Sequence, residues 1–421
     1  MATGVHGGGG HFFFERDYSA MTNCARVRNR LAGKAGRERG PLAKTKQIIA
    51  LDGLRFAAAL GVLLFHLGYW DWTKLGPFAG ASTAGYAVSI PFAWAGWIGV
   101  EVFFVLSGFV IAYSASGSAA GRFLRHRAIR LYPAALVCAS LTAVVLLALE
   151  RGWSAGYIAG LWLRSVCLSP RGPWVDGSYW TLGMEVWFYA LIFLLLAVKR
   201  AEWIGPAMGW IGGASTVYWV MALVHVRWPG VLRANVLSAG PRMGLLLDVF
   251  SVRYGCYFAV GVFLWLCLYR GCSAARLGAL GFSAAGGVAG IAMTTSSYSR
   301  ALGMQFSPVL PLSIWLAVLG LMVLAVKQNE AIHRLTGDGG AAGLRRVGLA
   351  TYPLYLLHQT IGIYLIEVLR GHLPDWGGWV LTVGLMLGLA YAVSAYVEPV
   401  LQRAMRWGFR GLETRFGWAP Q

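Results

Sequence analysis

Long apolar stretches recur along the chain from residue 48 onward, and short polar or basic segments separate them. A helix rises about 1.5 Å per residue, so roughly 20 apolar residues are needed to cross the hydrocarbon layer of a membrane. Stretches of about this length predict ten transmembrane helices, at residues 48–68, 92–113, 129–149, 179–198, 207–225, 245–269, 277–293, 309–326, 349–369 and 378–401. The expected fold class is therefore an all-α integral membrane protein.

Two parts of the chain depart from this pattern. Residues 155–168 are apolar but short, and Arg164 interrupts them, which favours an interfacial or re-entrant segment over a spanning helix. Residues 1–46 are rich in Gly and basic residues and show no apolar period, which indicates a disordered cytoplasmic tail rather than a signal peptide. The expected organisation is this tail, a membrane-embedded domain at 47–405 and a short basic cytoplasmic tail at 406–421.

Composition supports a membrane protein and excludes two other classes. Hydrophobic residues make up 57% of the 421 residues and charged residues only 13%, whereas soluble proteins carry about 25% charged residues. A soluble enzyme is therefore excluded, and the 19 Trp, 18 Tyr and 20 Phe exclude disorder over the whole length. The six cysteines show no paired spacing typical of a metal site or a disulfide framework.

The net charge of +19 arises from 36 Lys and Arg against 17 Asp and Glu. These basic residues flank the apolar stretches and form no continuous basic face, so the positive-inside rule explains them better than nucleic-acid binding does. With the N-terminus inside, the cytoplasmic segments hold 25 of the 36 basic residues and the outer loops hold nine. This asymmetry predicts that both termini are cytoplasmic.

Ionisable side chains inside the apolar stretches are the candidates for function, because each costs at least about 2.5–3.5 kcal/mol in the membrane. Arg55 and His66 lie eleven residues apart in the first stretch. Eleven residues make about three helical turns, so both side chains project from nearly one face, about 16 Å apart along the axis. Arg55 is expected toward the cytoplasm and His66 toward the outside. The alternatives are an ion pair of Arg55 with Asp52 and an interfacial position for His66.

Glu185 lies in the outer third of its predicted helix, at the same expected depth as His66. A carboxylate that accepts a hydrogen bond from one imidazole nitrogen leaves the other nitrogen free to act as a general base. The two residues are therefore predicted to form a catalytic pair that takes a proton from an alcohol. Alternatively, Glu185 accepts hydrogen bonds from a neighbouring indole or hydroxyl group.

The stretch at 92–113 carries two further polar residues, Glu101 and Ser107. Ser107 and the adjacent Gly108 favour close approach of a second helix and also offer a hydroxyl group. Glu101 is either a second carboxylate of the site or a protonated core residue. A nucleophilic Ser107 would need a base at its own depth, and none is evident.

A basic cluster precedes the stretch at 129–149. Arg127 and Arg130 are three residues apart and can share a helical face, where their forked donors suit phosphate oxygens. Charge that merely sets the membrane orientation would also explain the cluster. Glycine-rich phosphate loops of the nucleotide-binding types are absent from the sequence.

These motifs together resemble the acyltransferase-3 family of integral membrane O-acyltransferases. The matching segments, in the family's order, are Asp52-Gly53-Leu54-Arg55 with His66, Phe103 to Phe109, Arg127-x-x-Arg130, Trp180 to Glu185, Thr351 to His358, and Glu398-Pro399. Two departures are Thr351, where the family more often has Ser, and Val186-Trp187, where another acid and Gln are usual.

The resemblance implies transfer of an acyl group, most often acetyl, from cytoplasmic acyl-CoA to a hydroxyl of a carbohydrate or other acceptor. It implies that His66 is the essential histidine, that Glu185 is its acidic partner, and that Arg55, Arg127 and Arg130 bind the donor. Ser107 is grouped with the donor-binding residues. The further candidates for substrate binding are Glu101, Trp180, Tyr355 and His358.

Acyl-CoA is expected as a donor substrate, with no permanently bound cofactor and no metal. The other expected partners are a glycan or similar acceptor and the lipid bilayer of a bacterial cytoplasmic membrane. Some relatives carry an appended hydrolase-like domain, and here a stand-alone membrane domain is expected. Two alternatives stay open: a transporter or exporter of a glycan or organic acid, in which Arg55, Glu185 and His358 line the path, and an enzyme that acylates a small secondary metabolite.

Overall fold

The computed structural model describes residues 47–70, 93–228 and 252–416. The chain divides into two units, Met1–Gln47 and Ile48–Gln421. The tail predicted at residues 1–46 lies outside the described residues, as do residues 71–92, 229–251 and 417–421.

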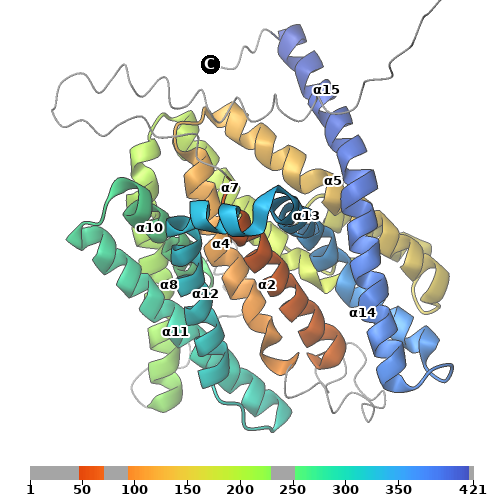
Figure 1. Cartoon of the computed structure of the whole chain (residues 1–421). Coiled ribbons are helices and arrows are strands. Elements are labelled where there is room, and N and C mark those ends of the chain that lie inside the picture. Colours follow the sequence, from red (N-terminus) through yellow and green to blue (C-terminus); the bar gives the residue numbers. More distant parts are fainter. Residues whose placement is uncertain (1–46, 71–92, 229–251, 417–421) are drawn as a thin grey trace, which may run out of the picture. The chain divides into compact units, whose positions relative to one another are not determined.

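The described part of the second unit is built from helices, and none of its residues forms a named strand (Figure 1). The α-helices are α2 (Ile49–Gly68), α4 (Ile98–Ala115), α5 (Ala120–Leu149), α6 (Ala155–Val166), α7 (Trp180–Ala197), α8 (Ile204–Arg227), α10 (Gly255–Arg270), α11 (Ala274–Leu302), α12 (Val309–Lys327), α13 (Asn329–Leu369), α14 (Asp375–Ala392) and α15 (Glu398–Phe416). Short helical turns η4 (Trp94–Trp97), η5 (Gly177–Tyr179) and η6 (Ala201–Trp203) precede α4, α7 and α8, and a π-helical turn, η8 (Val393–Val397), joins α14 to α15.

Eight helical segments of the described residues are long and apolar enough to cross a membrane, which supports an integral multi-pass protein. They correspond to eight of the ten predicted stretches. The other two stretches correspond to α10, which has 16 residues, and to the second half of α13. The count of ten and the cytoplasmic termini therefore stay predictions. Helix α6 has 12 residues, too few to span the hydrocarbon layer, as expected for the segment at 155–168.

Several helices extend beyond the apolar stretches that predicted them. Helix α5 begins at Ala120 rather than at residue 129, and α13 begins at Asn329 rather than at residue 349, with a break at Gly337. Helix α15 continues to Phe416, so most of the predicted C-terminal tail is helical. Hydropathy detects only the lipid-compatible part of a helix, whereas backbone hydrogen bonds continue through a basic extension.

Helices α4 and α10 approach each other closely in the core, and two glycines permit this. A Cβ atom added at Gly108 would lie 2.2 Å from the carbonyl oxygen of Phe258, and one added at Gly261 would lie 2.0 Å from that of Val105. Only glycine allows backbones to approach this closely. The expected packing role of Gly108 is confirmed.

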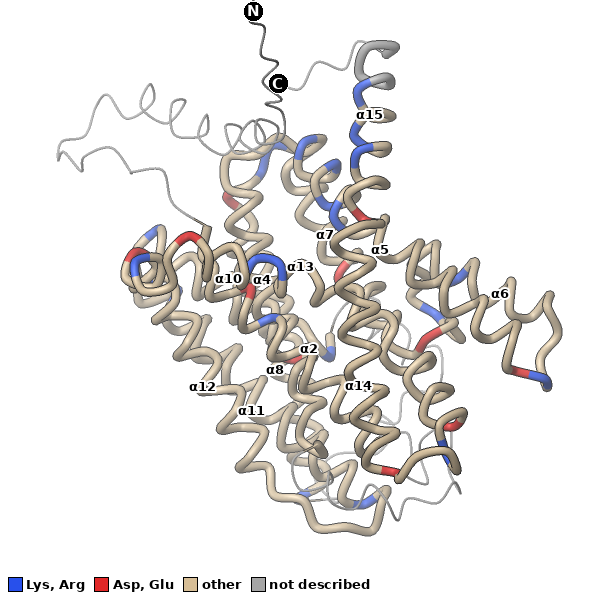
Figure 2. Tube along the Cα trace, turned by 45° about the vertical axis from the view of Figure 1, so that its right-hand side comes forward, with Lys and Arg blue, Asp and Glu red and all other residues tan. Residues whose placement is uncertain are grey.

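Charged residues are absent from long central parts of the described helices α11, α12 and α14, which are coloured tan in Figure 2. Blue positions gather along α15 and near the start of α5 (Figure 2). Helix α2 packs mainly against α13 and α4, so its charged residue Arg55 faces the interior of the bundle.

Candidate active site

A cavity of about 810 Å³ lies among helices α2, α4, α5, α7 and α13. Its polar lining includes Arg55, Ser107, Arg127, Arg130, Glu185 and Tyr355, and we call it the basic cavity. Its charged lining residues are three arginines and one glutamate, so an anion is favoured inside it. The three arginines predicted to bind the donor are thus brought together.

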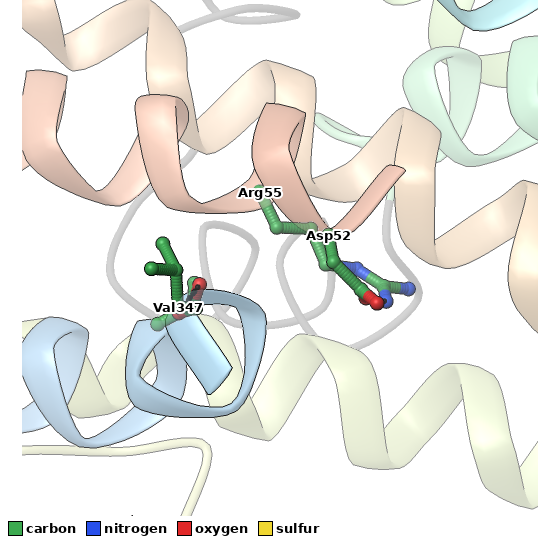
Figure 3. Close-up of polar contacts among 4 residues, drawn as sticks. Asp52, Arg55 and Val347 are labelled. Carbon is green, nitrogen blue, oxygen red and sulfur yellow. Dashed lines mark hydrogen bonds and ion pairs between the residues drawn. The ribbon is translucent and has the colours of Figure 1, made fainter. Parts of the chain in front are cut away.

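Arg55 is held in place by its own helix and by α13. Its guanidinium nitrogen Nη1 lies 3.5 Å from Oδ1 of Asp52, and both side chains are largely buried. Figure 3 shows the two side chains projecting together from α2, with Val347 of α13 opposite them. A Cβ atom added at Gly348 would lie 2.4 Å from Cβ of Asp52, so α13 can pack here only with glycine at this position. The ion pair offered as an alternative for Arg55 is present, and Arg55 also lines the cavity.

Arg127 is the most deeply placed arginine of the α5 cluster, with 8% of its surface exposed. It donates a hydrogen bond to Ser114, and its guanidinium lies 5.4 Å from the ring centre of Phe123 and 5.5 Å from that of Tyr189. Its Nε atom has no hydrogen-bond partner among the described residues. Arg130 lines the same cavity from a more exposed position. A buried guanidinium with an unused donor suits a phosphate oxygen.

Glu185 lies beside the arginines and accepts two hydrogen bonds through one oxygen, Oε1. The donors are the hydroxyl of Ser107 at 3.1 Å and that of Tyr189 at 2.5 Å. These are hydroxyl partners of the kind offered as the alternative for Glu185. None of the hydrogen bonds described for Glu185 involves His66, so their catalytic pairing stays a prediction.

His66 lies against a second histidine from α13. The ring centres of His66 and His358 are 5.1 Å apart, and the ring of Phe65 lies 5.2 Å from that of His66. Nδ1 of the fully buried His358 lies 2.8 Å from the carbonyl oxygen of Tyr355. Because a carbonyl oxygen only accepts, Nδ1 carries the proton, and Nε2 is an acceptor without a partner among the described residues.

Tyr355 connects the two histidines to the basic cavity. It lines that cavity, and its ring centre lies 5.8 Å from the ring centre of His358. His66 is not among the residues that line the cavity. The rings of Tyr355, His358 and His66 therefore form a row that leads from the basic cavity to His66.

Asp176 was not among the residues singled out from the sequence. It accepts hydrogen bonds from the backbone N–H and the hydroxyl of Ser178 at 2.9 and 2.6 Å, and from the backbone N–H of Thr360 at 2.8 Å. It thereby fixes the start of α7 to α13. Burial raises the pKa of Asp176, while these hydrogen bonds and the nearby His66 act in the opposite direction. An Asp two residues before a Ser, just ahead of Trp180, is the helix-start signal that could have identified it.

A second cavity, of about 450 Å³, lies among η4, α4, α7, α8, α10 and α11. Six aromatic side chains line it together with Val100, Glu101 and Thr294, and we call it the aromatic cavity. The six are Trp97, Trp180, Trp219, Tyr254, Tyr257 and Tyr298. The four residues expected to bind substrate are thus separated: Glu101 and Trp180 line the aromatic cavity, Tyr355 lines the basic cavity, and His358 lies beside His66.

Comparison with known proteins gives two findings. A family model described as an acyltransferase domain, of the acyltransferase-3 type, matches residues 48–395. The chain is also similar to a protein of Komagataeibacter xylinus with the provisional name membrane-bound transacylase BcsY. The two are 29% identical over 162 residues, which are 34% of this chain and 36% of the relative. No solved structure matches the chain.

The family model covers the helices that form both cavities, from the start of α2 to the end of α14. It includes every residue of the basic cavity and the row of rings that leads to His66. The chain therefore belongs to the acyltransferase-3 family of membrane acyltransferases.

Proposed function

We propose that this protein transfers an acyl group, acetyl in the simplest case, from acyl-CoA to a hydroxyl group of a carbohydrate-containing acceptor such as a cell-surface polysaccharide. Its location would be the cytoplasmic membrane of a bacterium, where the cytoplasm supplies the donor. The observation that carries this proposal is the basic cavity, in which three arginines share one space with a single carboxylate.

The basic cavity suits the phosphates of acyl-CoA. Its space of about 810 Å³ includes open solvent, so the assignment rests on its three arginines and not on its size. Arg127 has an unused donor, and Arg55 uses one guanidinium nitrogen for Asp52. In this proposal the phosphates lie at the arginines and the thioester lies toward Tyr355. Arg55 and His66 are separated by about 16 Å along the axis of α2, which is a plausible length for the extended pantetheine arm of acyl-CoA.

His66 is proposed as the general base. It takes the proton from the acceptor hydroxyl while that oxygen attacks the carbonyl carbon of the thioester. The carbon–sulfur bond then breaks, the acyl group stays on the acceptor oxygen, and the thiolate leaves with the proton returned by the imidazolium. His358, whose Nδ1 donates to the carbonyl oxygen of Tyr355, lies with its ring centre 5.1 Å from that of His66. Detection of a stable acyl adduct on His66 by mass spectrometry would overturn this direct attack.

Glu185 has two candidate roles in the same reaction. The family resemblance makes it the acidic partner of His66, whereas its hydrogen bonds place it with Ser107 and Tyr189 in the basic cavity. We propose that it limits the positive charge of the cavity and orients the hydroxyl of Ser107. The two roles differ in their effect on kcat and on the KM for acyl-CoA.

The test of the proposed function uses a deletion strain complemented with the wild-type protein or with His66→Ala. Surface polysaccharide and lipid extracts are compared by mass spectrometry for acyl mass increments, at equal membrane levels of the two proteins. An increment that is present with the wild type and absent with His66→Ala is expected, and its carrier identifies the acceptor.

The same comparison distinguishes the alternatives. An increment on a small metabolite instead of a glycan would identify that metabolite as the acceptor. Equal increments from both proteins would show that His66 is structural. A third outcome is that neither protein restores an increment and that the purified protein releases no CoA thiol with any extract. This outcome would contradict acyl transfer to an extracted acceptor. The transporter alternative is then tested by measuring solute movement into vesicles without acyl-CoA.

A further inference from the structure

The aromatic cavity lies in the interior of the helical bundle, so it differs from an aromatic belt at the membrane surface. Belt residues face the lipid headgroups. Here Trp97 and Tyr257 are only 4% and 1% exposed, and aromatic side chains from five separate helical elements line one space. These side chains therefore border an interior space of about 450 Å³, open solvent included, instead of lipid headgroups.

Two buried polar atoms of the aromatic cavity lack a partner among the described residues. They are Oε2 of Glu101, an acceptor when ionised, and Nε1 of Trp97, which only donates. Two other polar atoms of the lining are paired: Nε1 of Trp219 donates to the carbonyl oxygen of Arg253 at 2.7 Å, and the hydroxyl of Tyr257 donates to that of Gly287 at 3.2 Å. Buried polar groups are normally paired, and here an unpaired acceptor and an unpaired donor belong to residues that line one cavity, so a ligand with both kinds of group would complete them.

We propose that the aromatic cavity binds one sugar ring of the acceptor. This inference rests on the proposed function and names the place of the acceptor in it. The faces of Trp97, Trp180 and Trp219 would pack against the C–H faces of the ring. A sugar hydroxyl both donates and accepts, so hydroxyl groups can donate to Glu101 and accept from Nε1 of Trp97.

Other ligand classes satisfy this cavity less well. A lipid chain would pack against the aromatic faces but would leave both polar atoms unpaired. An organic cation would pair with Glu101 and bind the aromatic faces, but it has no acceptor for the N–H of Trp97. A neutral ring with several hydroxyl groups can pack against the aromatic side chains, and its hydroxyl groups can form hydrogen bonds with both the carboxyl group and the indole N–H.

The position of the aromatic cavity next to the basic cavity supports its assignment to the acceptor. Val100 lines both cavities. Phe104 lines the basic cavity, and its ring centre lies 5.0 Å from that of Tyr254 and 6.1 Å from that of Trp180, which line the aromatic cavity. One layer of α4 side chains thus separates the two cavities.

The test measures binding of a panel of methyl glycosides to the full-length protein in lipid nanodiscs by titration calorimetry, without acyl-CoA. The panel holds the methyl glycosides of glucose, galactose, mannose and N-acetylglucosamine. Two variants each remove the unpartnered polar atom: Trp97→Phe, which lacks the indole N–H, and Glu101→Met, which lacks both carboxyl oxygens at a similar side-chain length. The matched control is Trp265→Phe, because Trp265 is also buried with an unpartnered Nε1 among the described residues but lines neither cavity.

We expect at least one glycoside to bind the wild type and the control equally. Affinity should fall about tenfold in Trp97→Phe and in Glu101→Met, because each loses a buried hydrogen bond to the ligand. Binding of a non-hydrolysable acetyl-CoA analogue should be the same in all four proteins. Equal thermal melting in nanodiscs shows that the variants fold.

Three results would overturn the inference: no glycoside binds the wild type, both variants bind as the wild type does, or choline displaces the bound glycoside. Failure of the proposed function gives a different pattern of results. If glycosides bind the wild type but neither variant, and no glycan becomes acylated in the complemented strain, the sugar site is supported and the proposed reaction is contradicted. If acylation occurs and the variants bind glycosides normally, the reaction is supported and this sugar site is contradicted.

Discussion

The basic cavity and the aromatic cavity share a wall but have opposite chemistry. Three arginines and one glutamate supply the charge of the first, whereas six aromatic rings and a single carboxyl group characterise the second. An anionic donor needs fixed charges, which only paired or buried guanidinium groups can supply inside a membrane protein. A neutral ring needs flat apolar faces and a few hydrogen bonds. The difference teaches that one helical bundle can place a charged cavity and an aromatic cavity side by side, as the two proposals require for donor and acceptor.

Residues of helix α4 line both cavities. Ser107 faces the basic cavity and Glu101 the aromatic cavity, and six residues, or about 9 Å of helix, separate them. His66 lines neither cavity, and Tyr355 and His358 connect it to the basic one. In the two proposals, the cavities bind the substrates and the row of rings carries the chemistry, and a single substitution can test each role.

The largest expected effect is that of His66→Ala. If His66 is the general base, kcat falls by a factor of about 10² to 10⁴, while the affinities for acyl-CoA and acceptor stay the same. Release of CoA thiol by protein in nanodiscs measures kcat, and calorimetry with a non-hydrolysable analogue measures donor binding. Loss of donor binding together with activity would instead place His66 in the donor site.

Arg127→Gln should come next. It removes a buried guanidinium from the basic cavity, so the KM for acyl-CoA is expected to rise about 10- to 100-fold, as for the loss of a charge-assisted hydrogen bond. Arg125→Gln is the control, because Arg125 lies on the same helix but does not line the cavity. An equal rise in both variants would show that the general positive charge of α5, and not the cavity, attracts the donor.

Glu185→Gln tests whether the proposed catalysis by the histidines needs the charge of Glu185. The amide oxygen of Gln can still accept from Ser107 and Tyr189, so the variant removes charge and little else. A more positive cavity should bind acyl-CoA about two- to fivefold more tightly, while kcat changes less than about tenfold. A fall in kcat as large as that of His66→Ala would restore Glu185 as the acidic partner of His66.

Gly261→Ala tests the packing of α4 on α10, which keeps the wall between the cavities in place. The new Cβ atom would lie 2.0 Å from a backbone oxygen that no side-chain rotation can move. The free energy of unfolding is expected to fall by about 1–3 kcal/mol, the cost of an overpacked core. Gly278→Ala, where a Cβ atom meets nothing within 4 Å, should leave the thermal midpoint in detergent unchanged or slightly higher. Equal midpoints for the two variants would contradict the close contact.

The smallest effect is expected for Tyr364→Phe, because Tyr364 lines neither cavity. A hydrogen bond from Tyr364, and a second from the N–H of Gly152 at 2.9 Å, lower the pKa of Glu150. A lowered pKa means that the ionised carboxylate stabilises the fold above its unfolded pKa of about 4.3, and that this stability is lost as the pH falls through the lower folded value. The variant should therefore melt slightly below the wild type at neutral pH and equally with it in acid. Acyl transfer should not change.

The sequence alone could predict the membrane-spanning segments with good accuracy. Eight of the ten predicted stretches are long, apolar helices, because the thickness of the bilayer imposes a length that hydropathy reveals directly. Hydropathy could not show that α5 begins at Ala120 or that α13 begins at Asn329, since these extensions are too polar for lipid but still helical.

The candidate site was predictable in part. Arg55, Arg127 and Arg130 were expected to bind one donor, and they do line one cavity. The expected pairing of Glu185 with His66 rested on equal depth and on the family resemblance, and it stays a prediction. Depth places a residue along its own helix but does not say which neighbour it faces, and the hydrogen bonds of Glu185 are with Ser107 and Tyr189.

Helical period and apolar length establish where each segment lies in the membrane and which side chains share one face of a helix. They do not establish which helices become neighbours, because that depends on close packing between distant segments. Ser107 and Glu185 meet across 78 residues of sequence, and α4 meets α10 where two glycines allow it. The aromatic cavity arises in the same way, because its six rings come from five helical elements and no single stretch of sequence contains its pattern.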